Sequence, residues 1–488
     1  MSLASTLAIA NSGLANITAQ LAVVSQNVSN ANTAGYTPEI GQQSALSSDG
    51  VGYGVLTEAP TRSVNEMLQE EAWQQGATVA ALNANSQALA AIDAANGTPG
   101  QGNDLASLTG ALSDAFTTLS ADPSSTTEQG AVVSAANSLC STINSIAQAV
   151  GAQRQAAQDT VSQDLTQLNT ALASIGTLTS QILTDQNEGE GTASLEDQRD
   201  AAMSTVVQLT GAHFFTQSDG AEQVILPSGL TLPTDGSATL QLTDSQLTPE
   251  TAAPAVTLNG QDITADLTGG AIGANLTLRD VEMPTFQAEL DEFADNLAQR
   301  FSAAGLDLFT DSGGAAVAGA AASGPVQANY VGLANSIEVN PTVTANPALV
   351  QAGTNGAVTN ASDETVIDAV LNEAFGPASE STAPAPNVQG LGLNGTLSAP
   401  FGVPSSLADF AADVVSAQSG ASSQAATDLS NAQAVQQTLN SKVAAVSGVS
   451  VDTEMSTMIG LQNAYAANAR IITAIQQMWT SMLAMGAS

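Results

Sequence analysis

Apolar residues recur at alternating steps of four and three at both ends of the chain. The first set comprises Leu3, Leu7, Ala10, Leu14, Ile17, Leu21, Val24 and Val28. The second comprises Met458, Leu461, Tyr465, Asn468, Ile472, Ile475, Trp479 and Met482. A period of 3.5 residues is typical of coiled-coil helices, whose narrow apolar seam must be covered by another helix. The pattern therefore predicts two terminal helices that need partners, the nearest candidates being each other and further copies of the chain.

Further helices and a few strands are predicted between these ends. Helical patterns cover 62–95, 103–120, 127–186, 281–303, 363–375, 405–446 and 452–484. Strand-like runs cover 51–55, 223–226, 238–242 and 255–258, the last followed by Asn259-Gly260, a strong hairpin signal. A helix as long as 127–186 cannot bury its own apolar seam, so we expect antiparallel neighbours beside it.

The order of these elements predicts a mainly α fold with β-containing inserts. The terminal helices and the helical bundle are both discontinuous in sequence, because each apolar seam otherwise lacks a partner. We expect a terminal helical, coiled-coil base from residues 1–56 and 450–488. A helical bundle follows from 57–215, 275–310 and 400–449. The middle of the chain, 216–274 and 311–399, is expected to form a β-rich or irregular outer domain.

The charge is distributed unevenly along the chain. The formal net charge is −38, from 45 acidic and only 7 basic residues, yet residues 1–38 carry none and residues 455–488 carry only Arg470. Scarce cations exclude nucleic-acid binding and attraction to anionic membranes, since both require Lys and Arg. Exposed helix faces normally carry charge for solubility. The uncharged ends therefore favour a self-assembly surface over the alternative of an isolated helical hairpin.

Little in the sequence suggests catalysis or ligand binding. Cys140 is the only cysteine and His213 the only histidine. An internal disulfide therefore cannot form, and we expect no zinc site, catalytic triad or cofactor. The N-terminus lacks the basic segment of a secretory signal, and polar residues interrupt its apolar run. We therefore expect neither a cleaved signal nor membrane insertion.

Both ends of the chain resemble the signatures of bacterial flagellar axial proteins. The N-terminal resemblance lies in Gln26–Tyr36, and its motif residues are Asn30, Asn32, Thr33, Gly35 and Tyr36. At the other end, Val451–Met455 and Gln462–Ile472 are similar to the matching C-terminal signature.

Four internal segments are similar to FlgK-type hook-associated proteins in particular. They are Phe116–Pro123, Leu195–Asp200, the run Gly269–Gly273 with Leu278–Asp280, and Gly305–Phe309. Residues 310–400 match that family poorly, and Glu128-Gln129-Gly130 stands where the family usually has an arginine.

The resemblance implies a non-enzymatic structural subunit that joins the flagellar hook to the filament. It implies type III export, a brief cytoplasmic stage, and a final extracellular place in the flagellum. The implied partners are copies of itself, hook protein, the second hook–filament junction protein and an export chaperone. The N-terminal seam would serve self-assembly, and the C-terminal seam would serve both self-assembly and chaperone binding. The alternatives are another axial protein, either the second junction protein or hook protein, and a surface-displayed adhesin.

Asp197, Arg199 and Asp200 form the densest charged cluster of the helical region. No nucleophile, base or metal-type cluster accompanies them, so a catalytic interpretation is unattractive. We expect them to form structural ion pairs at a helix start, with Arg199 holding the helical domain together.

Overall fold

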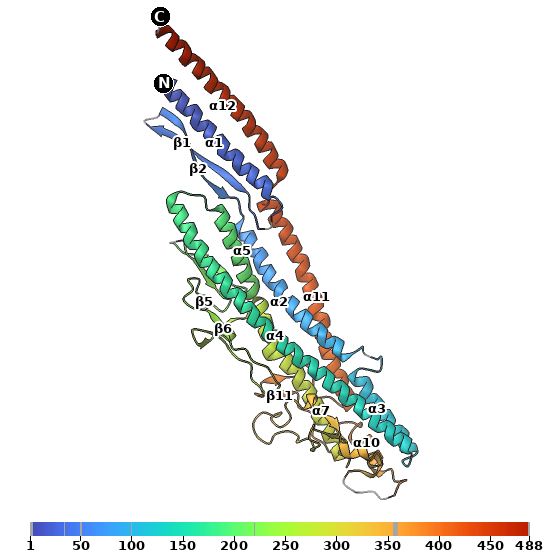
Figure 1. Ribbon diagram of the computed structural model, residues 1–488. Helices are drawn as coiled ribbons and strands as arrows, with labels where there is room; N and C mark the ends of the chain where they lie inside the picture. The colour runs from blue at the N-terminus through green and yellow to red at the C-terminus, as the bar shows by residue number, and fades with distance from the viewer. Residues whose placement is uncertain are drawn as a thin grey trace.

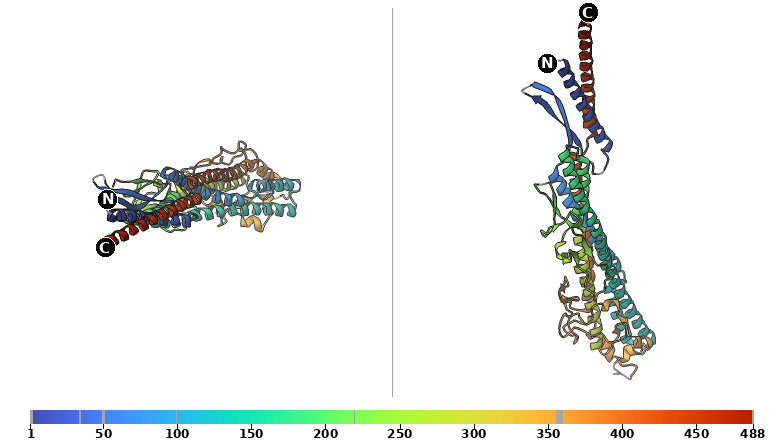
Figure 2. Two further views of the ribbon diagram at one scale, coloured as in Figure 1. Left: turned by 90° about the horizontal axis from the view of Figure 1, so that it is seen from above. Right: turned by 60° about the vertical axis from the view of Figure 1, so that its left-hand side comes forward.

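The computed structural model describes residues 3–33, 35–48, 51–98, 100–218, 220–354 and 360–486. The chain forms a long rod with both termini at one end (Figure 1, Figure 2). The α-helices are α1 (Leu3–Asn30), α2 (Glu66–Asn96), α3 (Leu105–Ala121), α4 (Thr126–Glu188), α5 (Ala193–Thr210), α6 (Gly270–Thr277), α7 (Met283–Ala303), α8 (Pro341–Ala345), α9 (Leu349–Ala352), α10 (Thr365–Glu373), α11 (Leu407–Ser447) and α12 (Val451–Gly486).

The strands are short except for the first two. They are β1 (Glu39–Ser48), β2 (Val51–Arg62), β3 (His213–Thr216), β4 (Glu222–Ile225), β5 (Thr231–Leu232), β6 (Leu240–Leu242), β7 (Val256–Leu258), β8 (Gln261–Asp262), β9 (Phe309–Thr310), β10 (Glu338–Val339), β11 (Gln389–Leu391) and β12 (Leu397–Ser398). The prediction of a mainly helical chain with small β-containing inserts, and with terminal helices that pack together, is confirmed.

The terminal end of the rod has three layers. α12 packs against one side of α1, and the antiparallel hairpin β1–β2 packs against another (Figure 1, Figure 2). Gly13 of α1 lies next to the side chain of Asn468 of α12, and Asn27, further along α1, is hydrogen-bonded to Glu454, which is earlier in α12. The two helices are therefore antiparallel. Leu3 therefore lies near the level of Met478, and the end of α12 projects past α1 (Figure 1).

The body of the rod is built around α4, whose predicted span of 127–186 closely matches its observed one. Its first turn is capped by Ser125, whose Oγ accepts a hydrogen bond from the Glu128 backbone N–H. Its last turn ends at Gly189 in the left-handed conformation. α3 and α5 pack along α4, and α2 pairs with α11 (Figure 1).

Two hydrophobic clusters fill the body. One joins α2, α3, the first half of α4, α7, α11 and the segment from Leu306 to Ala374. The other joins the second half of α4 to α5, α6 and the strands between β4 and β7. Among the described residues, neither cluster contains a member of α1, β1, β2 or α12. The body therefore has cores of its own, separate from the terminal layers.

The small sheets lie where strand-like runs were expected. β3, β4 and β5 form one three-stranded sheet, and β6, β7 and β8 form another. Asn259 and Gly260 both adopt positive φ between β7 and β8, as the predicted two-residue hairpin requires.

The segment between α7 and α11 has little regular structure, and polar side chains of α7 hold it in place. Asp291 accepts hydrogen bonds from the backbone N–H groups of Gly332 and Ala334 at 2.7 and 2.8 Å. Arg300 donates to the carbonyl oxygens of Ala374 and Gly376 at 3.0 and 3.1 Å. These bonds replace the sheet or helix bonds that the segment lacks.

The hairpin β1–β2 is the main element that the sequence analysis missed. Only residues 51–55 were expected to form a strand, whereas the pairing extends from Glu39 opposite Arg62 to the turn, interrupted by two irregularities. The glycines and serines of this region hide the alternation that normally marks strands. The turn itself lies outside the described residues.

α1 also differs from expectation in its hydropathy. By length and composition alone it could cross a membrane, with a mean hydropathy of 1.4 over its most apolar window. Its polar Asn16 and Asn27 are buried against the hairpin and the start of α12, which is the behaviour of a packed helix in a protein.

Candidate self-assembly surface

The two apolar seams meet each other over part of their length. On α1, Ala10, Ile17 and Val24 are buried, and Leu3, Leu7, Leu14, Leu21 and Val28 are half-buried. On α12, Ile475 is buried, and Met458, Leu461 and Ile472 are half-buried. The seam residues that remain exposed are Tyr465, Trp479 and Met482. The single chain therefore leaves apolar surface open on α12, mostly toward its end.

The axial-protein motif forms the turn that follows α1. Asn30 and Thr33 bond to each other and to the last turn of the helix, and Gly35 has a φ of +80°. Asn32 is exposed, and residue 34 lies outside the described residues. The motif thus reverses the chain so that the next strand returns along α1.

Asn27 is the centre of a buried hydrogen-bond network at this turn, and the sequence analysis did not select it. Its Oδ1 accepts from the Tyr36 hydroxyl at 2.7 Å and from the Glu39 backbone N–H at 3.0 Å. Its Nδ2 donates to the Glu39 carbonyl oxygen and to Glu454 Oε1. One amide therefore connects α1, β1 and α12.

Burial dominates the electrostatics of this network. It raises the pKa of Tyr36 to about 12, with further contributions from Glu39, Asp197 and Glu454. Burial, and then Asp197, also raises the pKa of Glu39. Tyr36 is therefore a neutral hydrogen-bond donor at any physiological pH.

Arg62, the last residue of β2, joins the terminal layers to the body. It pairs with Glu196 at 2.7 Å, Asp197 at 3.0 Å and Asp200 at 2.7 Å, all on α5. Burial alone would lower the pKa of Arg62, but Asp200, Asp197 and Glu196 together raise it.

Asp197 has a second partner on the terminal side. It accepts hydrogen bonds from the backbone N–H and the hydroxyl of Thr37 at 3.1 and 2.6 Å. Asp197 on α5 therefore binds both the hairpin, through Arg62, and the turn after α1, through Thr37.

The three charged residues singled out from the sequence do form ion pairs, but not with one another. Asp197 and Asp200 pair with Arg62, and Arg199 pairs with Glu222 on β4 at 3.4 Å. These partners lie more than twenty residues away along the chain, so local sequence could not reveal them.

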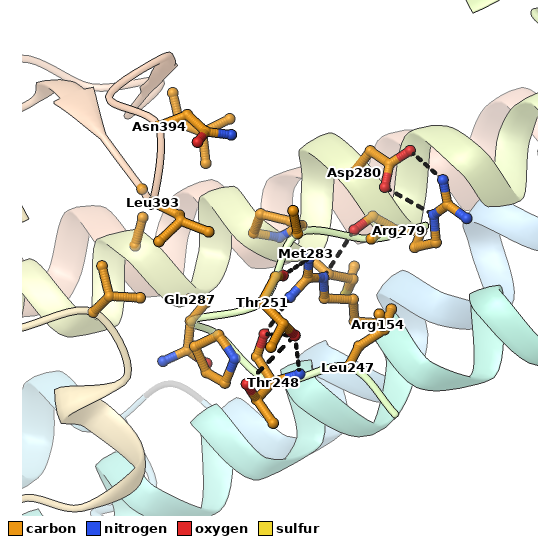
Figure 3. Close-up of a pocket in the computed structure, with 18 of the residues that line it drawn as sticks. Arg154, Leu247, Thr248, Thr251, Arg279, Asp280, Met283, Gln287, Leu393 and Asn394 are labelled. Carbon is orange, nitrogen blue, oxygen red and sulfur yellow. Dashed lines mark hydrogen bonds and ion pairs between the residues drawn. The ribbon is translucent and has the colours of Figure 1, made fainter. Parts of the chain in front are cut away.

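The body contains a cavity of about 320 Å³ between α4, α7 and two loops (Figure 3). Two arginines at its wall are already bound to protein atoms. Arg154 donates to the carbonyl oxygens of Thr248, Thr251 and Arg279 at 2.8, 3.1 and 3.0 Å, and Arg279 pairs with Asp280 at 2.7 Å. These cations hold loops in place. No group of His, Cys, Asp and Glu able to hold a metal occurs among the described residues.

Two family matches cover separate parts of this architecture. Residues 89–316, from the end of α2 past α7, match the flagellar hook-associated protein FlgK helical domain. Residues 441–485, mainly α12, match the flagellar basal body rod FlgEFG protein C-terminal segment.

Known proteins that are similar to the chain include the following two. It is 26% identical over 326 residues to flagellar hook-associated protein 1 of Escherichia coli (strain K12), covering 62% of this chain and 58% of that protein. The structure of the flagellar hook junction protein FlgK from Burkholderia pseudomallei is 24% identical and aligns over 53% of this chain and 47% of that one, with a TM-score of 0.42. The chain thus spans 58% of the length of its curated relative.

A terminal segment shared with rod proteins, joined to a hook-associated helical domain, defines the chain as a flagellar axial protein. Within that class its helical body matches the FlgK helical domain, and the chain is similar to flagellar hook-associated protein 1.

Proposed function

We propose that the chain is a structural subunit of the hook–filament junction and carries no enzymatic activity. The observation that carries the proposal is the terminal unit of α1 and α12, whose only charged residues are Asp452, Glu454 and Arg470. It lies at one end of a rod whose body has separate cores. Such a unit can be packed by neighbours on several sides, because burying Ser, Thr or Ala costs far less than burying an ion. The name of the Escherichia coli relative supports the same role.

The proposed partners follow from that role. Copies of this chain would surround one another through the terminal layers, with hook protein on one side and the second junction protein on the other. An export chaperone would cover the exposed apolar residues of α12 before assembly, because such surface promotes aggregation. The acidic body would face outward into solvent, where salt screens its charges over about 8 Å.

Electron microscopy of cells lacking the gene tests this function. We expect intact hooks without filaments, and we expect the gene supplied on a plasmid to restore the filaments. Normal filaments on the deleted cells would show the assignment to be wrong.

A further inference from the structure

We propose that the outer face of the β1–β2 hairpin in one copy binds one flank of α12 in a second copy. The hairpin face consists of Leu46, Leu56 and Glu58. The α12 flank consists of Arg470, Ile471, Met478 and Met482. In the contact, Arg470 lies opposite Glu58. The inference rests on the proposed self-assembling function and specifies which surfaces carry it.

The hairpin face points away from α1 and borders an open groove beside the end of α4. Thr57 donates a hydrogen bond to Asn16 of α1 at 3.3 Å, and Gln43 accepts one from the same side chain, so these two residues face α1. Successive strand residues point to opposite sides. Leu56 and Glu58 therefore point outward. Ser44 is paired with Leu56 and shares its face, so Leu46, two residues further along β1, points outward as well.

Two leucines interrupt the polar residues of this outward face, which also carries Gln42, Ser44 and Glu58. Leu46 is 47% exposed and Leu56 is 49% exposed. A two-layer antiparallel sheet usually places polar residues on its open side. Two exposed leucines there indicate a surface that another molecule covers.

The α12 flank is a second exposed apolar stripe. At 3.6 residues per turn, Arg470, Ile471 and Met478 share one side of the helix next to the seam that packs on α1, and the seam residue Met482 lies at the edge of this side. Ile471, Met478 and Met482 are 48%, 51% and 56% exposed. Because the terminal part of α12 projects past α1, part of this stripe has no neighbour within the described chain (Figure 1).

Charge fixes the pairing of the two surfaces. Arg470 is the only charged residue after Glu454, is exposed, and makes no ion pair with any described residue. Glu58 is likewise exposed, and its side chain has no partner in the part of the chain that the structure describes. It lines an open groove of about 680 Å³ together with the exposed Glu66 and Glu190, so the surroundings of the hairpin face are acidic. An exposed pair adds little affinity but favours the correct register.

The contact must join two copies. Within one chain α1 lies between α12 and the hairpin, so the two surfaces face different ways (Figure 1, Figure 2). A contact between two different patches is heterologous, and its repetition produces a ring or a helical tube rather than a closed dimer. That geometry is what a tubular flagellar segment requires.

Engineered disulfides test the contact in hook–filament particles isolated from cells. We would produce a chain carrying both Leu46→Cys and Met478→Cys, because with Arg470 opposite Glu58 these two positions lie at the same level. Each single variant is its control. Native Cys140 is buried, and burial raises its pKa to about 12, so it stays unreactive. After mild oxidation we expect a ladder of covalent dimers, trimers and larger species from the double variant and none from the single variants.

Three results would overturn the inference. They are the absence of product when the protein is present in the particles, a product that stops at the dimer, and a crosslink to a different protein. The last would assign the surface to another partner.

Exchange of the two charges gives an independent test. We expect Arg470→Glu and Glu58→Arg each to reduce filaments per cell about tenfold, and the double variant to recover most of them. Glu380→Arg, an exposed acid in the irregular segment before α11, is the matched control and should have no effect. A double variant no better than its singles would contradict the pairing.

These outcomes separate the inference from the function on which it rests. Loss of filaments on gene deletion, combined with no ladder and no rescue, would leave the junction role intact and discard only this contact. Normal filaments on gene deletion would discard the function itself.

Discussion

Arg62 makes the ion pairs that connect the terminal layers to the body, with three carboxylates of α5. Its guanidinium joins three carboxylates of α5 while both sides are largely buried, with side-chain exposures of 12% for Arg62 and 14% and 12% for Asp197 and Asp200. Removing it would leave buried anions without a cation. We expect Arg62→Ala to lower the free energy of unfolding by about 3 kcal/mol, measured by urea denaturation.

The matched comparison is Arg199→Ala. Arg199 forms one longer contact, 3.4 Å from Glu222, and Thr216 also donates to that carboxylate. We therefore expect a smaller loss, although the sequence alone favoured Arg199 as the residue that holds the domain. Equal effects of the two substitutions would contradict this ranking.

The importance of Asn27 illustrates what a sequence cannot reveal at the residue scale. An asparagine near a helix end is normally interpreted as part of a terminating turn. Its role here depends on Glu39 and Glu454 arriving from two other elements. Only the folded chain brings them together.

At the scale of elements, the long helices were predictable and the irregular parts were not. The helical patterns of 127–186, 405–446 and 452–484 gave bounds close to those of α4, α11 and α12, because period and length are local properties. The hairpin was missed because glycines and serines interrupt the alternation of polar and apolar residues along both strands. The segment before α11 could not be predicted, because it depends on distant contacts with α7.

α7 itself contradicts the usual interpretation of its sequence. Its acidic residues suggest a solvated face, yet Glu289, Asp291, Glu292 and Asp295 are all buried. Burial raises the pKa of Glu289 to about 8, and of Asp291 and Asp295 to about 7. These carboxyls are therefore largely protonated in the folded chain at mildly acidic pH.

This shift predicts how stability depends on pH. A carboxyl whose pKa is higher in the folded chain binds its proton more tightly there, so stability falls as pH rises from about 4 to about 8. We expect the thermal midpoint to be about 5 °C higher at pH 5 than at pH 8. Calorimetry across this range would measure it.

Neutral variants distinguish buried carboxyls from the general acidity of the chain. Glu289→Gln cannot ionise and should flatten the pH dependence, whereas Glu380→Gln on the surface should leave it unchanged. If the unaltered chain, Glu289→Gln and Glu380→Gln all showed the same pH dependence of the thermal midpoint, the dependence would come from the net charge of the chain instead.

For the whole molecule, separate cores imply that the body can exist without its terminal layers. A fragment of residues 61–449 retains both hydrophobic clusters and the ion pairs of Arg62. We expect it to be a soluble monomer with one cooperative unfolding transition, checked by sedimentation and circular dichroism. An unfolded fragment would mean that base and body form one cooperative unit.

The boundaries proposed for the three domains would be examined by the same fragment. The segment from Leu306 to Ala374 shares a cluster with α3, α4 and α7, so we expect it to remain ordered there. Protection of its amides from hydrogen exchange would measure this directly.

The antiparallel pairing of α1 and α12 also has a practical consequence for labelling. Because both ends of the chain emerge at one tip, an epitope or fluorescent protein fused to either end would sit among the packed helices. The turn between α3 and α4, where Asp122 and Ser124 are exposed, lies at the other tip (Figure 1). A label inserted there would leave the packed end free and would report where the subunit stands in a living cell.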